Sequence, residues 1–282
     1  AGLVGWGAVR AALGPVERYR RAAAAGGDPS TRLPVDADRD DELTRLGSTF
    51  NGLLAEIEQG QIRERQFLAD ASHELRSPLA LMAAEVEWAS HRPRTPAELD
   101  RVLGSIGGQT ERLIQLANSL LDLEEITTTG TGTWSSVPID EVVDAALAEV
   151  RTAARDAGRE IVVHATKQRA AVDRSWLERA VTNLAVNAIR HGSGTVTVTA
   201  GVTGRILHVE VIDEGGGIPH TLADRAFDRF ARGDSSRSTP GHGLGLALVQ
   251  AVAVRHGGSA HLVDGGVRID IPLTVEDGTF LR

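Results

Sequence analysis

The feature that most constrains the fold is an apolar repeat at spacings of three and four residues, which occupies much of the first half of the chain. It begins near Asp41 and reaches Trp88, and after a break at residues 90–99 it continues from Leu99 to Leu123. Such spacing places apolar side chains on one face of a helix. We therefore expect two long helices joined by a short loop, a helical hairpin. One hairpin leaves its apolar seam half covered, so the pattern predicts a homodimer in which two hairpins form a four-helix bundle.

The residues before this repeat suggest a linker. Residues 8–25 have a helical pattern, residues 26–41 form a polar connector with two prolines, and a second helix starts at Asp41. This order resembles the HAMP linker that follows a membrane span in bacterial receptors, and we assign residues 1–60 to it. Residues 1–9 are uncharged but shorter than the roughly 20 residues needed to cross a bilayer. We expect them to be the cytoplasmic end of a membrane helix.

Composition narrows the class of protein. The chain has 282 residues, of which 41% are hydrophobic and 24% charged, as in soluble globular proteins. Its formal charge of −8 argues against a general nucleic-acid binder. It has no cysteine, which excludes disulfides, Cys-based zinc sites and thiol chemistry. The only methionine is Met82, so we expect an excerpt of a longer protein or a processed one.

The second half of the chain has a mixed pattern. After Ile126 we expect a linker, TTTGTGTWSS, and then an α+β sandwich. Expected strands, by β-branched content and alternation, are IVVHA, TVTVTA, ILHVEVID and the hairpin HLVDGGVRIDIPL. Expected helices are Ile139–Ala157, Trp176–His191 and Leu244–His256. The predicted fold is therefore multidomain: an all-α helical hairpin at 61–127, followed by a separate α+β domain at 128–282.

One stretch of the hairpin, FLADASHELRSPLA, carries reactive groups. Its apolar residues form one seam, and His73 lies about 200° around the helix from Ala71 and from Leu75, so it faces outward. Pro78 has no N–H, which removes the helical partner of the Glu74 carbonyl. A neutral imidazole beside a carboxylate can act as a nucleophile, with Glu74 taking its proton or fixing its tautomer. The alternative is a solvated histidine on a bundle surface, and this stretch alone does not decide between them.

Four stretches of the second domain indicate a nucleotide pocket. Asn183 and Asn187 are four residues apart on one helix face, and amide oxygens suit Mg²⁺. Asp213 ends an apolar strand and precedes three glycines, so its carboxylate could accept a hydrogen bond from an exocyclic amine. In GHGLGLALVQ, glycines open a helix N-terminus, an arrangement that binds anions. Residues 226–240, AFDRFARGDSSRSTP, lie between the Asp213 stretch and GHGLGLALVQ, and we interpret them as a lid over the nucleotide.

Taken together, these motifs resemble those of the sensor histidine kinases of bacterial two-component systems over almost the whole chain. FLADASHELRSPLA resembles the H box, TNLAVNAIRHG the N box, DEGGGI the G1 box, AFDRFARGD the F box and GHGLGLALV the G2 box. The resemblance implies ATP-dependent phosphorylation of His73, with ATP and Mg²⁺ as cofactors, and phosphotransfer to an Asp of a response regulator. It also implies a protein anchored in the bacterial inner or plasma membrane, with this portion cytoplasmic.

The resemblance also implies roles for individual residues. His73 becomes the phosphoacceptor and Glu74 its acid/base partner. Asn187 becomes the Mg²⁺ ligand, with Asn183 close to the metal and its waters. The remaining residues implied at the nucleotide site are Arg190 near phosphate, His191 at the nucleoside, Asp213 at the adenine amine, and, around the pocket and lid, Gly215, Gly217, Phe230, Gly241, Gly243, Leu244 and Gly245.

Some positions depart from the family pattern. Ser77, four residues after His73, stands where Thr or Asn often positions the water that dephosphorylates the regulator, so we expect possible phosphatase activity of unknown strength. His242 stands where a small hydroxyl residue is usual, and Glu214 and Gly216 stand where Asn and Pro are frequent. The histidines outside the motifs are interpreted as structural or surface residues: His91, His164, His208, His220, His256 and His261.

Two alternatives remain beside the kinase. An ATPase or serine kinase on the same fold predicts no role for His73 and a Glu at the position of Asn183, which the sequence does not have. A degenerate sensor would bind nucleotide as a dimeric scaffold without transferring phosphate. The intact His73, Glu74, Asn187 and Asp213 argue against this scaffold.

Overall fold

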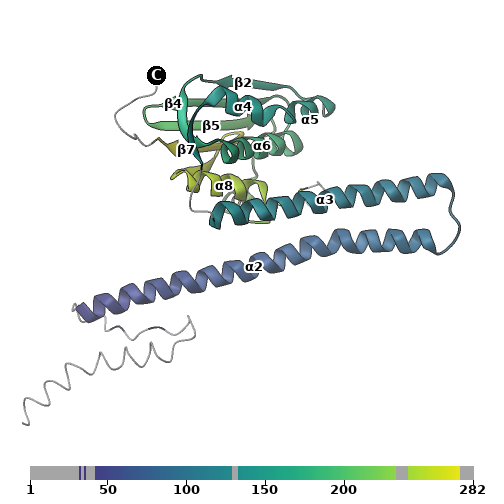
Figure 1. The fold of residues 1–282 in the computed structure, drawn as a ribbon, viewed down its shortest axis with the longest axis horizontal. Helices are drawn as coiled ribbons and strands as arrows, with labels where there is room; N and C mark the ends of the chain where they lie inside the picture. The colour runs from purple at the N-terminus through teal and green to yellow at the C-terminus, as the bar shows by residue number, and fades with distance from the viewer. Residues whose placement is uncertain (1–31, 33–34, 36–41, 129–132, 233–240, 274–282) are drawn as a thin grey trace, which may run out of the picture. The chain divides into compact units, whose positions relative to one another are not determined.

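The computed structural model describes residues 32, 35, 42–128, 133–232 and 241–273 (Figure 1). The expected helix at 8–25, almost all of the connector and most of the lid lie outside these residues. The chain divides into two compact units, residues 1–73 and residues 74–282. Each unit is described separately below.

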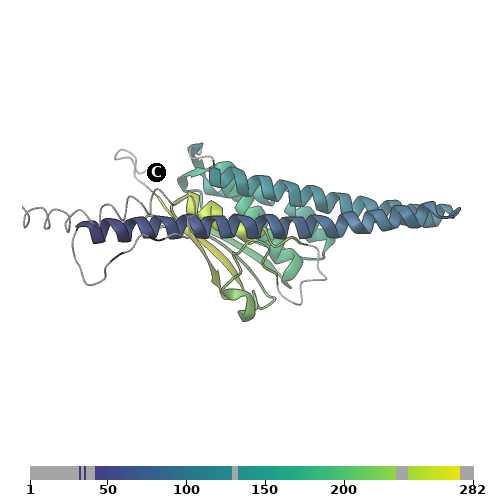
Figure 2. The same ribbon diagram turned by 90° about the horizontal axis from the view of Figure 1, so that it is seen from below.

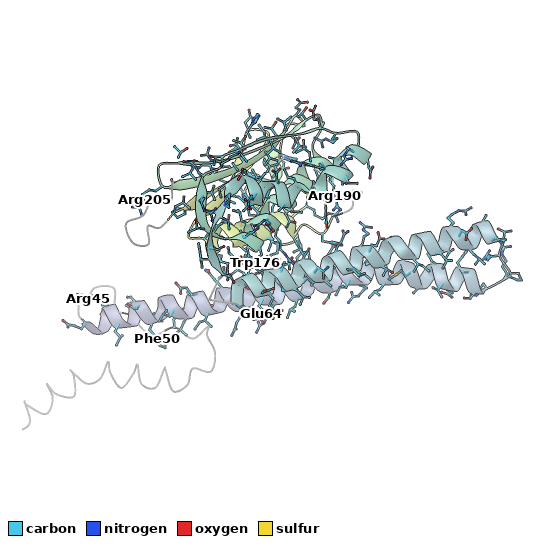
Figure 3. The ribbon with its side chains drawn as sticks, turned by 45° about the horizontal axis from the view of Figure 1, so that its top comes forward. Arg45, Phe50, Glu64, Trp176, Arg190 and Arg205 are labelled. Atoms are coloured by element: carbon cyan, nitrogen blue, oxygen red, sulfur yellow. The ribbon has the colours of Figure 1, made fainter. Side chains whose placement is uncertain are left out.

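The first unit contains the beginning of helix α2, which spans Glu42–Ser90. Its predicted apolar seam is exposed: Leu46 is 62% exposed, and the Phe50 side chain points away from the helix (Figure 3). Arg32 pairs with Glu58 at 2.5 Å. Exposed apolar side chains therefore recur along this part of the helix at the spacing that the repeat predicts. Among the described helices, none combines the length and apolar character needed to cross a bilayer.

The second unit opens with the rest of α2, which runs antiparallel to α3, Pro96–Thr128 (Figures 1 and 2). Ser105 Oγ donates to Glu85 Oε1 at 3.3 Å, so these two positions of the helices lie side by side. Helix α3 begins with a capping box in which Glu98 Oε2 accepts from the Thr95 N–H at 2.8 Å. The predicted helical hairpin is confirmed.

A five-stranded sheet follows, in the order β2-β4-β5-β7-β6, with β2 parallel to β4 and all other neighbours antiparallel. Its strands are β2 Ile161–Ala165, β4 Val196–Thr203, β5 Ile206–Asp213, β6 Ser259–Val263 and β7 Gly266–Pro272. A separate antiparallel pair is formed by β1 Trp134–Pro138 and β3 Arg169–Asp173.

Helices cover one face of the large sheet (Figure 1). They are α4 Ile139–Leu147, α5 Val150–Asp156, α6 Arg174–His191 and α8 Gly245–Arg255, and the short helix α7, His220–Ala223, follows β5 in the chain. Alternate residues of β5 and β7, such as Val209 and Ile269, are buried against α6 and α8, as a period of two requires. Leu116 and Leu123 of α3 are buried in the same core. The predicted order, a helical region followed by an α+β domain, is confirmed.

Two details of the sequence analysis are wrong. The expected helix Ile139–Ala157 is two helices, because the helix is interrupted at Ala148 and Glu149. Buried residues continue at helical spacing from Leu147 to Val150 across this break, so the apolar pattern cannot reveal it. The expected linker TTTGTGTWSS also contains the start of β1, and strand β3 was not predicted at all. These two short strands lack a clear alternation of apolar residues. They also pair with each other across 30 residues or more of chain, which no local pattern reveals.

Candidate active site

Helix α6 positions most of the candidate nucleotide-binding side chains. Asp173 caps its N-terminus, accepting from Ser175 Oγ at 2.8 Å and from the Trp176 N–H at 3.4 Å. Figure 3 labels Trp176 and Arg190 near the two ends of the helix. Because Asn183, Asn187 and His191 recur every four residues, they lie along one side of α6 and can face one ligand.

A cavity opens beside the C-terminal half of α6. Its lining residues are Leu184, Asn187, Ala188, His191, Gly192, Val211, Asp213, Gly217, Ile218, Gly266 and Val267. The sequence analysis predicted four of these, Asn187, His191, Asp213 and Gly217. Apolar walls with few polar groups are typical of sites that bind a planar ligand. The structure therefore brings the N box and the G1 box together around one cavity.

The carboxylate of Asp213 is held by backbone amides. Its Oδ1 accepts from the Gly215 N–H at 2.7 Å and from the Ser193 N–H at 3.2 Å. Among the described residues, Oδ2 accepts no hydrogen bond, which leaves an acceptor for a ligand. A Cβ at Gly192 would lie 2.1 Å from the Asp213 carboxyl carbon, so the absence of a side chain there makes room for this carboxylate.

The glycine-rich loop before α8 lies against the same helix. A Cβ at Gly241 would lie 4.0 Å from His191 Nε2, and one at Gly245 would lie 3.1 Å from Asn183 Oδ1. Asn183 Nδ2 donates to the Arg179 carbonyl at 2.9 Å, which orients the amide and leaves its oxygen toward the loop. The structure thus brings Asn183 and the G2 box together, although Asn183 does not line the cavity described above.

The F box joins this loop through one backbone bond. The Phe230 N–H donates to the Gly243 carbonyl at 2.8 Å, and both residues have positive φ angles, 62° and 66°. A positive φ is rare for a phenylalanine, and such backbone strain concentrates at functional sites. Leu244, which follows Gly243, is 2% exposed and anchors the start of α8 in the core.

The electrostatics of α6 favour a neutral His191. Partial burial of the ring lowers the pKa of His191 below its usual range, and the positive charges of Arg190 and Arg232 act in the same direction. Arg190 itself is exposed and does not line the cavity. A neutral imidazole can contact a nucleoside without adding charge.

The candidate phosphoacceptor segment lies on α2. His73 is exposed, as its position on the helix predicts, and it is the last residue of the first unit. Glu74 and Ser77 begin the second unit, where Glu74 is half-buried and Ser77 is exposed. Helix α2 continues through Pro78 without interruption.

His242 has contacts that the sequence analysis did not anticipate. Its Nε2–H donates to the Arg112 carbonyl of α3 at 3.0 Å, and its Nδ1 lies 3.6 Å from Glu74 Oε2. Burial lowers the pKa of His242, while Glu74 and the Arg112 carbonyl oppose this shift. The G2-box histidine therefore contacts the helical hairpin, and one of its neighbours is the proposed acid/base residue.

A larger cavity of about 460 Å³ lies away from these motifs. It is lined by Arg151, Ala154, Arg155, Gly158, Arg159, Glu160 and Ile161. None of these residues belongs to the N, G1, F or G2 boxes. The residues that the sequence analysis predicted for a nucleotide line the smaller cavity at Asp213 instead. Among the described residues, no group of three or more His, Cys, Asp or Glu side chains could hold a metal.

Sequence reasoning missed several residues around the cavity at Asp213. Gly192 and Ala188 lie within the N box and could have been found from their closeness to Asn187. Gly266 was interpreted only as part of a hairpin turn, and Val267 lines the cavity because β7 pairs with β5. Ser193 contributes only its backbone N–H to the site, so its residue type gives no indication of this role.

Comparisons with known proteins agree with this geometry. The family described as "His Kinase A (phospho-acceptor) domain" matches residues 63–129, and "Histidine kinase-, DNA gyrase B-, and HSP90-like ATPase" matches residues 172–278. The chain is 34% identical over 273 residues to "Signal transduction histidine-protein kinase/phosphatase MprB" of Mycolicibacterium vanbaalenii. That match covers 94% of this chain and 56% of the relative.

Two solved structures are similar in fold. The histidine kinase AdeS of Acinetobacter baumannii matches with a TM-score of 0.57 and 22% identity, covering 72% of this chain and 98% of AdeS. The histidine kinase ThkA, solved in complex with the response regulator protein TrrA, matches with a TM-score of 0.61 and 18% identity, covering 78% of this chain and 66% of that one. The chain spans about half the length of the curated relative it matches.

Proposed function

We propose, on the premise that this chain belongs to the two-component sensor histidine kinases, that it transfers the γ-phosphate of ATP to His73 and then to an aspartate of a response regulator. The observation that carries the proposal is the single cavity that Asn187, His191 and Asp213 share. Family membership explains why a helix with an exposed histidine precedes such a cavity in the chain.

Asp213 is the proposed reader of adenine. With Oδ1 held by the amides of Ser193 and Gly215, its orientation is fixed before the ligand arrives. Oδ2 then accepts from the exocyclic amine of adenine, a group that guanine does not present at the same position. Preorganisation of this kind lowers the cost of binding. Val211 and Ile218 supply apolar walls for the base.

Asn187, with Asn183 nearby, is the proposed holder of Mg²⁺ at the phosphate end. The Asn183 oxygen is oriented by the bond from its Nδ2 to Arg179, so the residues present fit a hard cation that keeps several of its waters. When bound, the metal supplies positive charge that neutralises the phosphates. Arg190, exposed at the end of α6, can approach the phosphate oxygens from solvent.

The acid/base groups favour transfer to histidine over hydrolysis. Related ATPases carry a Glu at the position of Asn183, and an amide cannot take a proton from water. On α2, Glu74 adjoins His73 and can accept the proton of its attacking imidazole. Ser77, one turn after His73, is the proposed position for a water that would dephosphorylate the regulator. The chemistry therefore depends mainly on positioning and charge stabilisation.

The wider organisation is also proposed. Residues 1–60 form a HAMP-like linker after a membrane segment, residues 61–127 the phosphoacceptor hairpin and residues 128–282 the ATP-binding domain. Leu103, Ile114 and Leu121 are exposed apolar side chains on α3, which supports a homodimer through the hairpins. ATP and response regulators are cytoplasmic, so this portion is placed on the cytoplasmic side of the membrane.

Incubation of the purified chain with γ-labelled ATP and Mg²⁺ tests the proposal. We expect an acid-labile, alkali-stable label that is absent from His73→Gln and retained by His91→Gln, a control just after the end of the same helix. Asp213→Asn should lose the label together with ATP binding. ATP binding without any label in the parent chain would instead support the nucleotide-binding scaffold, and label retained by His73→Gln would overturn the assignment.

A further inference from the structure

The turn that holds Asp213 is itself held by an arginine outside the sequence motifs. Arg159 lies between α5 and β2, and its backbone N–H donates to the Ala154 carbonyl at 2.8 Å. Its side chain reaches across to the C-terminus of α6. The Nη1 group donates to the Ala188 carbonyl at 2.6 Å and to the Ile189 carbonyl at 2.9 Å. These carbonyls lie near the C-terminus of the helix, and the Ala188 carbonyl also accepts from the Gly192 N–H at 2.9 Å.

The same guanidinium also binds the turn after the helix. Arg159 Nε donates to the Gly194 carbonyl at 2.9 Å. Three hydrogen bonds from one planar group therefore fix the end of α6 and the turn at 192–194 as a unit. Arginine suits this task, because its donors have a fixed fork geometry that lysine cannot reproduce. A positive charge at a helix C-terminus also complements the helix dipole.

This turn contacts the nucleotide cavity directly. Ser193 donates its N–H to Asp213 Oδ1, and its carbonyl accepts from the Glu214 N–H at 3.0 Å. Gly192 faces the Asp213 carboxylate, and Ala188, whose carbonyl Arg159 binds, lines the cavity. A shift of the turn would therefore change where the Asp213 carboxylate points.

We propose that Arg159 is a positioning residue of the nucleotide pocket, which sets the orientation of Asp213 and so the preference for adenine. The inference rests on the proposed function, since Asp213 is taken to read the base. Arg159 Nη2 is buried without a partner among the described residues. An unpaired buried donor lowers stability. The presence of Arg159 is therefore better explained by the positions of the three carbonyls that it holds than by a purely stabilising role.

Binding of ATP and of ITP, which lacks the exocyclic amine, to the full chain distinguishes positioning from general damage. For Arg159→Ala we expect the Kd for ATP to rise about tenfold, equal to about 1.4 kcal/mol, with little change for ITP. Arg159→Lys should recover part of the ATP affinity, because an ammonium can bind one or two of the three carbonyls. Arg155→Ala is the matched control: this arginine lines the same larger cavity as Arg159, and among the described residues its side chain donates to the Arg151 carbonyl of its own helix and to no part of α6.

Amide hydrogen exchange gives a readout that needs no ligand. Arg159→Ala and Arg159→Lys should accelerate exchange of the Ser193 and Gly215 amides and leave strand β5 protected. Equal losses for ATP and ITP, or unchanged exchange at both amides, would overturn the inference. If the parent chain binds no ATP, the proposed function fails, and the exchange result still decides whether Arg159 orders this turn.

Discussion

The backbone N–H of Asp173 donates to Nε2 of His256, 83 residues later in the chain, at 3.0 Å. The other ring nitrogen, Nδ1, carries the proton and donates to the Val252 carbonyl at 2.8 Å. His256 is 3% exposed and stacks edge-on with Trp134 at 4.8 Å between ring centroids. The bond to Nε2 requires a neutral ring, because a protonated Nε2 has no lone pair with which to accept, so this histidine joins the start of α6 to the end of α8 only when it is uncharged.

The first prediction is that folding stability declines in mild acid through His256. Burial lowers the pKa of His256 in the folded protein, so the unfolded chain binds the proton more readily. Stability from this residue is full above the unfolded pKa of about 6.5 and is lost as the pH falls below it. His256→Gln should flatten the dependence of unfolding free energy on pH between about 7.5 and 5.5, since an amide can make both bonds without titrating.

Chemical denaturation at several pH values measures this effect. His164→Gln, at an exposed position of β2, is the control and should leave the pH dependence unchanged. His256→Ala should lower stability by about 1–3 kcal/mol at pH 7.5, because the Asp173 N–H is left buried without an acceptor. Parallel pH profiles for the parent and His256→Gln would refute the assignment.

The second prediction concerns the space that Gly192 leaves for Asp213. In Gly192→Ala the new methyl group would lie 2.1 Å from the carboxyl carbon, so the carboxylate must move. The backbone at Gly192, φ −86° and ψ −172°, suits alanine, so the effect is steric. We expect at least about a tenfold loss of ATP affinity, the cost of one lost hydrogen bond to a charged group.

Gly201→Ala in β4 is the control for this substitution. A Cβ at Gly201 meets no atom within 4 Å, and ATP affinity should stay within about twofold of the parent value, since a substitution with open space around it and far from special features changes little. Isothermal titration with a non-hydrolysable ATP analogue measures both variants. Unchanged affinity in Gly192→Ala would mean that Asp213 does not contact the base.

Local sequence patterns predicted those helices and strands whose apolar residues recur at a single regular spacing. The alternation of ILHVEVID matches β5 residue for residue, and the apolar seam from Leu99 to Leu123 lies within α3. The cavity residues Asn187 and Asp213 were predictable, because Asn187 shares a helix face with Asn183 and Asp213 ends an apolar strand. These features depend on neighbours close in sequence.

Contacts between distant segments could not be predicted. Arg159 has no motif of its own, and its role depends on how the parallel pairing of β2 and β4 brings it to the end of α6. His242 seemed to be a variant of a phosphate loop, yet its partners Glu74 and Arg112 lie far away in the chain. Tertiary packing determines which residues become such partners, and the type of a single residue does not predict them.

The third prediction tests the proposed homodimer. Ile114 is 55% exposed, Leu121 is seven residues later on the same face of α3, and Leu103 is three turns earlier. Ile114→Glu places a charge where a second hairpin would bury it, and desolvation should raise the dimer dissociation constant by about 100-fold. Gln115→Glu, exposed about 100° around the helix, is the control. Light scattering that finds Ile114→Glu still dimeric at concentrations where the parent chain dimerises would exclude this face.

The last prediction is that His242 restrains Glu74. With Nε2–H donated to the Arg112 carbonyl, a neutral His242 presents the lone pair of Nδ1 to Glu74 Oε2 at 3.6 Å. When His242 is protonated, its Nδ1–H faces the Glu74 carboxylate, and a carboxylate held in this ion pair accepts the proton of His73 less readily. The substitution His242→Ser removes the ring and introduces the small hydroxyl residue that is usual at this position. We expect the initial rate of autophosphorylation at saturating ATP to rise about threefold, as loss of a weak ionic contact allows.

The pH dependence separates this restraint from a simple change in ATP binding. In the parent chain the rate should rise more steeply with pH than in His242→Ser, because loss of the His242 proton releases the Glu74 carboxylate from the ion pair, and burial lowers the pKa of His242 so that this occurs in mild acid. Glu74→Gln should abolish the gain when combined with His242→Ser, since both changes act on the same carboxylate. Equal rates for the parent and His242→Ser at every pH, with unchanged KM for ATP, would show that the contact between His242 and Glu74 has no part in catalysis.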